Sequence, residues 1–111
     1  MKDTISFKEF QKMDLRVGRV DEATAPDWSE SLLQMKVDFG QEIGQRTILV
    51  GAKEQYQPEV FTGKNFLFLV NLAEKEMGES VSQGMMLMAV EAGEPIKFEL
   101  PSELNPGTVV R

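Results

Sequence analysis

The sequence predicts an all-β domain built as a small barrel or sandwich. Its apolar residues fall into five or more short segments separated by glycine and proline, and no stretch has the periodicity of a long helix. Short strands punctuated in this way are typical of closed or two-layered β folds. With 111 residues, of which 41% are hydrophobic, the chain is expected to form one domain, residues 1–111, around a single core.

A short helix is expected near the N-terminus. Ser6 and Glu9 have the spacing of a capping box, in which each side chain accepts a hydrogen bond from the other residue's backbone amide. The apolar side chains of Phe7, Phe10 and Met13 would lie on one side of this helix.

The first strands of the predicted sheet come next. Residues 15–25 alternate imperfectly between apolar and polar side chains, and Gly18 within them predicts a bulge or a sharp bend. The clearest period of two follows, with apolar side chains at Leu33, Met35, Val37 and Phe39. Residues 40–44, which begin and end with glycine, predict a hairpin turn, and residues 46–50 the returning strand.

The C-terminal half is expected to complete the sheet. Residues 52–56 and 58–61 predict two helical turns. The runs 66–72 and 85–90 are apolar at nearly every position, which is typical of central strands that are buried on both faces.

The last segment is predicted to mediate self-association. A turn is expected at residues 91–95, a short strand at 96–100 and an extended arm at 101–111. Residues 96–101 carry apolar side chains that a barrel of this size cannot easily cover alone. We therefore expect a homodimer that buries them against a second copy.

Composition excludes several functional classes. The chain has no cysteine and no histidine, which excludes disulfides, thiolate and ordinary zinc sites and imidazole acid–base catalysis. Acid pairs such as Asp21 and Glu22 lack an accompanying nucleophile, so we expect neither an enzyme nor a cofactor. There is no apolar signal region and no apolar run near the roughly 20 residues of a membrane span. The expected location is cytoplasmic, without membrane association.

Several segments in order resemble one family. The sequence Ser82-Gln83-Gly84-Met85 resembles the signature of the EMAP-II-like tRNA-binding OB domain. This family includes the C-terminal or β-subunit domain of methionyl-tRNA synthetase, free-standing tRNA-binding proteins and the CsaA chaperone branch. The other similar positions are 10, 13–20, 32–40, 51, 56–59, 63–64 and 71–72.

The resemblance implies a fold and a ligand. It implies a five-stranded OB barrel with a C-terminal extension that pairs two subunits, and tRNA as the ligand. The residues at the family's RNA-contacting positions are Asn71, Lys75, Ser82 and Met85. OB barrels also bind oligonucleotides on the face of strands 2 and 3, which adds Lys36 and Arg46, with Lys53 and Lys64 as edge contacts.

Several of these residues have an alternative structural interpretation. Methionine often fills gaps in a core, and asparagine often caps a turn, which would account for Met85 and Asn71. Lys36 could belong to an ordinary solvated strand face. Trp28, the single tryptophan, could stack on a base or cover the end of the barrel.

Electrostatics predicts weak RNA binding. The net charge is −6, whereas nucleic-acid binding depends on clustered lysine and arginine. Glu74, Glu76 and Glu79 flank Lys75 within a screening length of about 10 Å. The leading prediction is a non-catalytic tRNA-binding protein, free-standing or a detached synthetase module, that binds weakly.

The alternative is a dimeric protein-interaction module of the CsaA type with little RNA binding. The methionine-rich run 85–88 supports it, because methionine side chains adapt to varied apolar partners. Expected partners are therefore tRNA and a second copy, with a synthetase or unfolded protein chains as further candidates.

Overall fold

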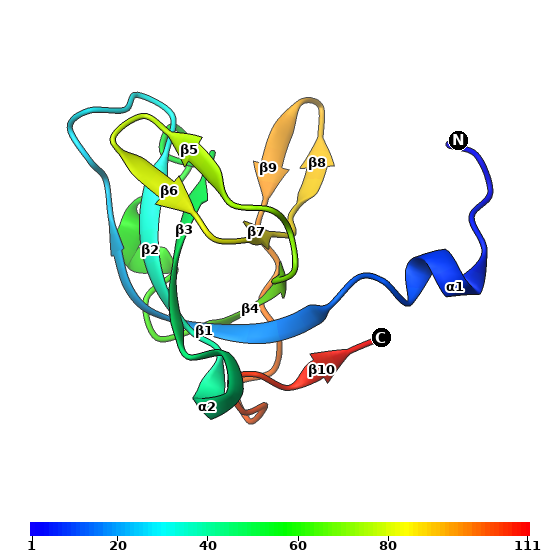
Figure 1. Ribbon diagram of the computed structural model, residues 1–111. Coiled ribbons are helices and arrows are strands. Elements are labelled where there is room, and N and C mark those ends of the chain that lie inside the picture. Colours follow the sequence, from blue (N-terminus) through cyan, green and yellow to red (C-terminus); the bar gives the residue numbers. More distant parts are fainter.

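Five antiparallel strands form the barrel in the computed structural model, which describes residues 1–111 (Figure 1). Their order across the sheet is β3 (Gln45–Val50), β2 (Leu33–Asp38), β1 (Leu15–Thr24), β4 (Asn65–Leu69) and β7 (Met85–Met86). The amide of Gln83 donates to the carbonyl of Thr47 at 2.9 Å, which brings the chain just before β7 against β3 and nearly closes the sheet. The predicted all-β barrel of OB type is confirmed.

The core occupies the inside of this barrel. Leu33, Met35, Val37 and Phe39 are all buried, while Lys36 between them is exposed, so the predicted alternation of β2 is confirmed. The largest fully buried side chains are phenylalanines, which pack edge-on or tilted against one another: Phe39 on Phe68, and Phe61 on Phe66. Burial of this aromatic cluster is the main driving force for barrel closure.

Gly18 has a different role from the one expected. The β1–β4 ladder passes through it without interruption, and the irregularity in β1 lies between Val20 and Glu22. The predicted bulge at Gly18 is therefore wrong. A Cβ at this position would lie 2.6 Å from both the Phe39 ring and a Val37 methyl, so glycine is required by close packing against the core.

Short helical elements connect the strands. The capping box of Ser6 and Glu9 is confirmed, and it begins the one-turn helix α1 (Phe7–Phe10). A second one-turn helix, α2 (Gly40–Ile43), joins β2 to β3 where a plain hairpin turn was expected. The turn at residues 52–56 is confirmed by a 3.0 Å bond from the Tyr56 amide to the Ala52 carbonyl, and η1 (Pro58–Val60) confirms the next one.

Residues 85–100 depart from the expected pattern. The predicted central strand 85–90 is wrong, because the chain leaves β4 after Leu87 and forms a separate hairpin. This hairpin pairs β8 (Ala89–Glu91) with β9 (Glu94–Ile96) around the expected turn. The predicted strand 96–100 is also wrong, since only Leu100 returns to pair with β4. An apolar run therefore did not correspond to a continuous strand.

The C-terminal arm is docked on the barrel. β10 (Val109–Val110) pairs with the start of β1. The Val17 amide donates to the Thr108 carbonyl at 2.9 Å, and the Gly107 amide donates to the Val17 carbonyl at 2.8 Å. In Figure 1 the C-terminus lies beside the segment that leads to α1, which itself stands away from the barrel and has no buried residue. No helix has the length and apolar character that a membrane crossing requires.

Candidate nucleic-acid interface

The segment between β4 and β7 forms a β-hairpin where a loop was expected. β5 (Lys75–Met77) pairs with β6 (Ser80–Ser82), and Gly78 at the turn has φ of 63°. In Figure 1 this hairpin lies across one end of the barrel, close to the tip of the loop that follows β1. The hairpin contains Lys75 and Ser82, and Asn71 and Met85 lie on either side of it, so all four positions that resemble the family's RNA-contacting residues are on or beside it.

The two faces of the hairpin carry different side chains. Lys75 is directly opposite Ser82, and Glu76 is directly opposite Val81. Because side chains alternate along a strand, Lys75 and Ser82 share the face toward the barrel, whereas Glu76 and Val81 share the outer face. Ser82 is buried and Val81 is exposed, in agreement with this assignment. The carboxylate of Glu76 therefore points away from the face that carries Lys75.

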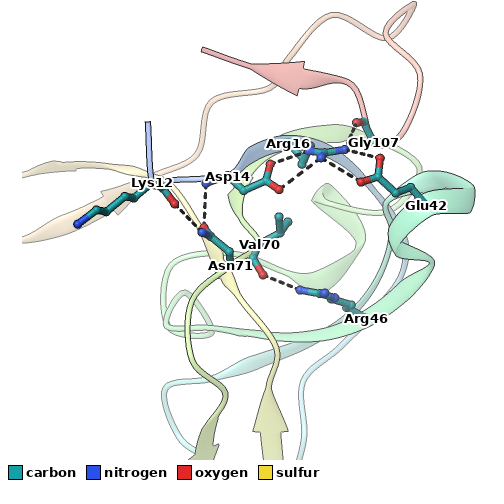
Figure 2. A network of polar contacts seen from close by, with 8 residues as sticks. All are labelled: Lys12, Asp14, Arg16, Glu42, Arg46, Val70, Asn71 and Gly107. Atoms are coloured by element: carbon teal, nitrogen blue, oxygen red, sulfur yellow. Dashed lines mark hydrogen bonds and ion pairs between the residues drawn. The ribbon is translucent and has the colours of Figure 1, made fainter. Parts of the chain in front are cut away.

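Arg46 fastens the base of the hairpin. Its guanidinium donates from Nη1 to the carbonyl of Val70 at 2.6 Å (Figure 2) and to that of Gln83 at 3.2 Å. These two carbonyls lie on either side of the hairpin, so a single side chain from β3 holds both of its ends. Arg46 therefore lies beneath the predicted interface and stabilises the hairpin.

Ser82 lies at the same base and is fully engaged. Its hydroxyl accepts a hydrogen bond from the Leu49 amide and donates one to the Gly84 carbonyl, each at 3.0 Å. The neighbouring Gln83 accepts from the Thr47 amide through Oε1 at 2.9 Å. The hydroxyl of Ser82 therefore connects β6 to β3 and is 5% exposed as a residue, so its geometry is that of a structural link.

Asn71 connects the hairpin to the N-terminal segment (Figure 2). Its Oδ1 accepts from the Asp14 amide at 2.8 Å, and its Nδ2 donates to the Lys12 carbonyl at 2.6 Å. Both polar groups of the amide thus hold the chain that leads into β1. The residue is exposed, but its hydrogen-bonding capacity is largely used within the protein.

The predicted cations outside the hairpin are also partnered. Lys53 Nζ donates to the carbonyls of Pro26 and Ser29, which fixes the loop between β1 and β2. Lys36 lies 3.6 Å from Glu22 in an exposed pair, and Lys64 lies 3.3 Å from Glu99.

The pKa of Glu99 is lowered by its hydrogen bonds to Lys97 and Lys64. Carboxylates elsewhere on the barrel therefore neutralise part of the basic charge that a phosphate would need.

Arg16 belongs to the segment 13–20 that resembles the family, and its side chain also makes contacts within the protein. Arg16 Nε lies 2.6 Å from Asp14, and its Nη atoms reach Glu42 and the Gly107 carbonyl (Figure 2). The hydrogen bond to Asp14, followed by that to Glu42, raises the pKa of Arg16 above its ordinary value. This guanidinium joins β1, α2 and the C-terminal arm.

Lys75 and Met85 are predicted site residues whose side chains are exposed and make no hydrogen bond or ion pair within the protein. Lys75 is exposed and makes no ion pair with Glu74, Glu76 or Glu79. Met85 is 48% exposed, and the core position expected for it is taken by Met86. The interpretation of Met85 as a core residue is therefore wrong. Because side chains alternate along a strand, a shift of one residue in the assignment exchanges the core-facing side chains for the solvent-facing ones.

Two further residues, Gln83 and Trp28, pack at the interface. Gln83 lies between the barrel and Glu74, with Nε2 3.4 Å from the carboxylate. Trp28 is half-buried and packs against Gly78 at the tip of the hairpin. Gly78, between two short polar segments, indicates a hairpin turn in the sequence. Nothing local in the sequence indicates that the side chain of Trp28 lies on it.

Comparison with known proteins decides the family. A family model described as "Putative tRNA binding domain" matches residues 15–109. This chain belongs to that tRNA-binding domain family. Methionine–tRNA ligase from Methanococcoides burtonii is 40% identical over 110 residues, which are 98% of this chain and 16% of the ligase. The ligase from Archaeoglobus fulgidus is 38% identical over 109 residues, again 98% of this chain and 16% of the ligase.

Solved structures of tRNA-binding domain relatives share the whole fold. A methionyl-tRNA-synthetase-related protein from Pyrococcus horikoshii superposes with a TM-score of 0.93 at 33% identity, covering 99% of this chain and 100% of that one. The chaperone CsaA from Bacillus anthracis superposes with a TM-score of 0.86 at 27% identity, covering 98% and 100%. The resemblance to this family is confirmed. Since the chain spans about 16% of the ligases, the similarity concerns one domain of them.

Proposed function

We propose that this chain is a non-catalytic tRNA-binding protein, either free-standing or a detached module of a methionyl-tRNA synthetase. One observation carries the proposal most directly. In a domain of the tRNA-binding family, the hairpin that crosses the end of the barrel exposes Lys75, whose ammonium group has no carboxylate partner. Such a group neutralises a backbone phosphate without first losing an interaction within the protein.

The other predicted residues support this contact in different ways. Met85 offers an apolar surface beside the hairpin on which a base or ribose packs. Lys36 can exchange Glu22 for a phosphate at little cost, because an exposed ion pair contributes at most about 1 kcal/mol. Arg46, Ser82, Asn71 and Lys53 define the shape of the surface.

We further propose that binding is weak and strongly dependent on salt. The segment 74–79 carries Glu74, Glu76 and Glu79 against Lys75, a local net charge of −2. Glu76 faces away from Lys75, yet it remains within the roughly 10 Å screening length at 0.1 M salt. The ligand contact is therefore made against a partly opposing field.

The Lys75→Glu variant tests the site. We expect about fivefold weaker binding of bulk tRNA at about 50 mM salt, and a log–log salt slope that is shallower by nearly one unit, because one phosphate contact is lost. Fluorescence anisotropy with labelled tRNA measures both quantities. The matched control is Lys2→Glu, which makes the same charge change at the exposed N-terminus, far from the hairpin (Figure 1). Equal loss in the two variants would contradict the site, and no binding by the wild type would contradict the function.

We propose a homodimer as the assembled form. Phe7 is 72% exposed on a four-residue helix that has no buried residue, although an isolated helix of this length is unstable in water. Phe7 also lines a groove of about 690 Å³ between α1 and the C-terminal strand. A second copy would cover either this surface or the segment 96–101 considered from the sequence, where Ile96 and Phe98 are exposed.

Light scattering over a wide concentration range distinguishes these two surfaces. If the groove is the interface, Phe7→Asp is expected to give a monomer while Ile96→Asp remains dimeric. The reverse result would place the interface on the 96–101 segment. A monomeric wild type at all concentrations would exclude the dimer.

A chaperone-like interaction module is the second candidate function. It is favoured by a group of exposed apolar side chains on and beside the β8–β9 hairpin: Met85, Val90, Ile96 and Phe98. A surface of this kind fits apolar segments of unfolded chains. Suppression of the aggregation of a denatured test protein would support it, especially if Val90→Asp removed the effect; no suppression by the wild type would argue against it.

A further inference from the structure

The indole of Trp28 packs directly on the tip of the β5–β6 hairpin. A Cβ built on Gly78 would lie 2.3 Å from Cζ3 and 2.5 Å from Cε3 of the indole, so only glycine leaves room for the ring. Gly78 also has φ of 63°, in the left-handed region that favours glycine. The single tryptophan of the chain therefore holds a position that depends on a glycine fifty residues away.

The loop that carries Trp28 is itself anchored on the barrel. Lys53 Nζ donates to the carbonyls of Pro26 and Ser29, on either side of the tryptophan. The backbone amide of Lys53 donates to the carbonyl of Ser31 at 3.1 Å. The hydroxyl of Ser29 accepts from the amides of Ser31 and Leu32. The indole thus projects from a fixed support.

The hairpin needs such a support. β5 and β6 pair only with each other, and a two-stranded hairpin by itself is marginally stable in water. Its base is held by Arg46 and Ser82, as described above. Trp28 supplies a contact at the opposite end, at Gly78. Lys75 lies at the base end, opposite Ser82, and β5 connects it to the tip that Trp28 covers.

We propose that Trp28 is a positioning residue for tRNA binding, which holds the hairpin so that Lys75 meets the RNA in a preformed orientation. This inference rests on the proposed tRNA-binding function. A preordered segment binds more tightly because less conformational freedom is lost on association. The six-membered ring of the indole already contacts Gly78, so Trp28 is assigned a role through the hairpin and not as a stacking platform for a base.

The first test is the Trp28→Ala variant. Roughly tenfold weaker tRNA binding is expected, with the same salt slope as the wild type because no phosphate contact is removed. Trp28→Phe is expected to recover most of the affinity, since a smaller ring still covers Gly78. If the wild type binds tRNA and Trp28→Ala binds equally well, the inference fails while the proposed function stands. If the wild type does not bind, the two fail together.

The second test separates positioning from stacking. Gly78→Ala places a methyl group where the indole now lies and is expected to weaken binding about as much as Trp28→Ala. The double variant should be no weaker than the Trp28→Ala single variant, because both changes remove one contact. Gly93→Ala is the control: Gly93 has φ of 79° in the other hairpin turn and no atom within 4 Å of its Cβ position. It should match Gly78→Ala in backbone strain and leave tRNA binding unchanged.

A base that stacks on Trp28 would give a different pattern. Gly78→Ala would then free the ring and leave the affinity unchanged or higher. Stacking would also strongly quench the fluorescence intensity of this single tryptophan when tRNA binds. A ring that stays on Gly78 keeps its fluorescence unchanged. Either of these observations would overturn the positioning role.

Discussion

Replacement of Glu74, Glu76 and Glu79 by glutamine is expected to strengthen tRNA binding by about tenfold in the limit of low salt. The substitutions change the local charge of segment 74–79 from −2 to +1 and keep the size of each side chain nearly constant. A unit charge about 9 Å from a phosphate contributes roughly 0.5 kcal/mol in water, so three of them account for about 1.4 kcal/mol before screening. The gain should shrink steadily as salt is raised, because screening removes this term.

Anisotropy titrations of the triple variant at several salt concentrations measure this effect. The control variant has Glu54, Glu91 and Glu103 replaced by glutamine. It makes the same change in net charge at exposed positions outside the β5–β6 hairpin. Similar strengthening in both variants would mean that net charge alone governs binding. Unchanged affinity of the triple variant would mean that RNA does not approach the hairpin, and the proposed interface would be abandoned.

The second large effect concerns stability, and it centres on Asn65. This side chain is 2% exposed; its Oδ1 accepts from Arg19 Nε, and its Nδ2 donates to the carbonyls of Pro101 and Leu104, all at 3.0 Å. Asn65→Ala removes three part-buried hydrogen bonds at a buried side chain and leaves Arg19 Nε without its acceptor. We expect a loss of about 3 kcal/mol in the free energy of unfolding.

Chemical denaturation of Asn65→Ala tests this expectation. Asn71→Ala is the matched control, because Asn71 also makes two hydrogen bonds but is exposed, and it should cost about 1 kcal/mol or less. Hydrogen exchange at the Val110 amide, which faces Leu15 in the ladder, should also accelerate in Asn65→Ala, since Asn65 holds the segment that leads to β10. Equal losses in the two variants would show that burial of the Asn65 network contributes little.

Much of the fold followed from local pattern. The strict alternation in residues 33–39 predicted β2, and the capping box at Ser6 predicted the start of α1; both are confirmed. A period of two and a reciprocal cap depend on neighbours in sequence, so they are readable without a three-dimensional partner. The wholly apolar run 85–90 lacked such information, because a segment that is apolar on both sides does not reveal where it changes partner.

The site residues were harder to predict than the family. The order of motifs led correctly to the tRNA-binding domain family, but the roles of individual residues depend on their contacts. Arg46 and Lys53 looked like basic contacts, and the structure shows their donors on carbonyls of the chain itself. Those acceptors are 24 or more residues away in sequence, so no local pattern indicates them.

The sequence by itself determined the barrel, the family and the acidic character of segment 74–79, since these reside in short-range pattern, in ordered motifs and in composition. Tertiary structure alone decided that Met85 faces out and Met86 in, that Asn65 holds the C-terminal arm, and that Trp28 lies on Gly78. The reason is physical. Burial and hydrogen bonding between distant segments arise only when the barrel closes. They decide which of several chemically similar side chains, such as Met85 and Met86, is buried and which is exposed.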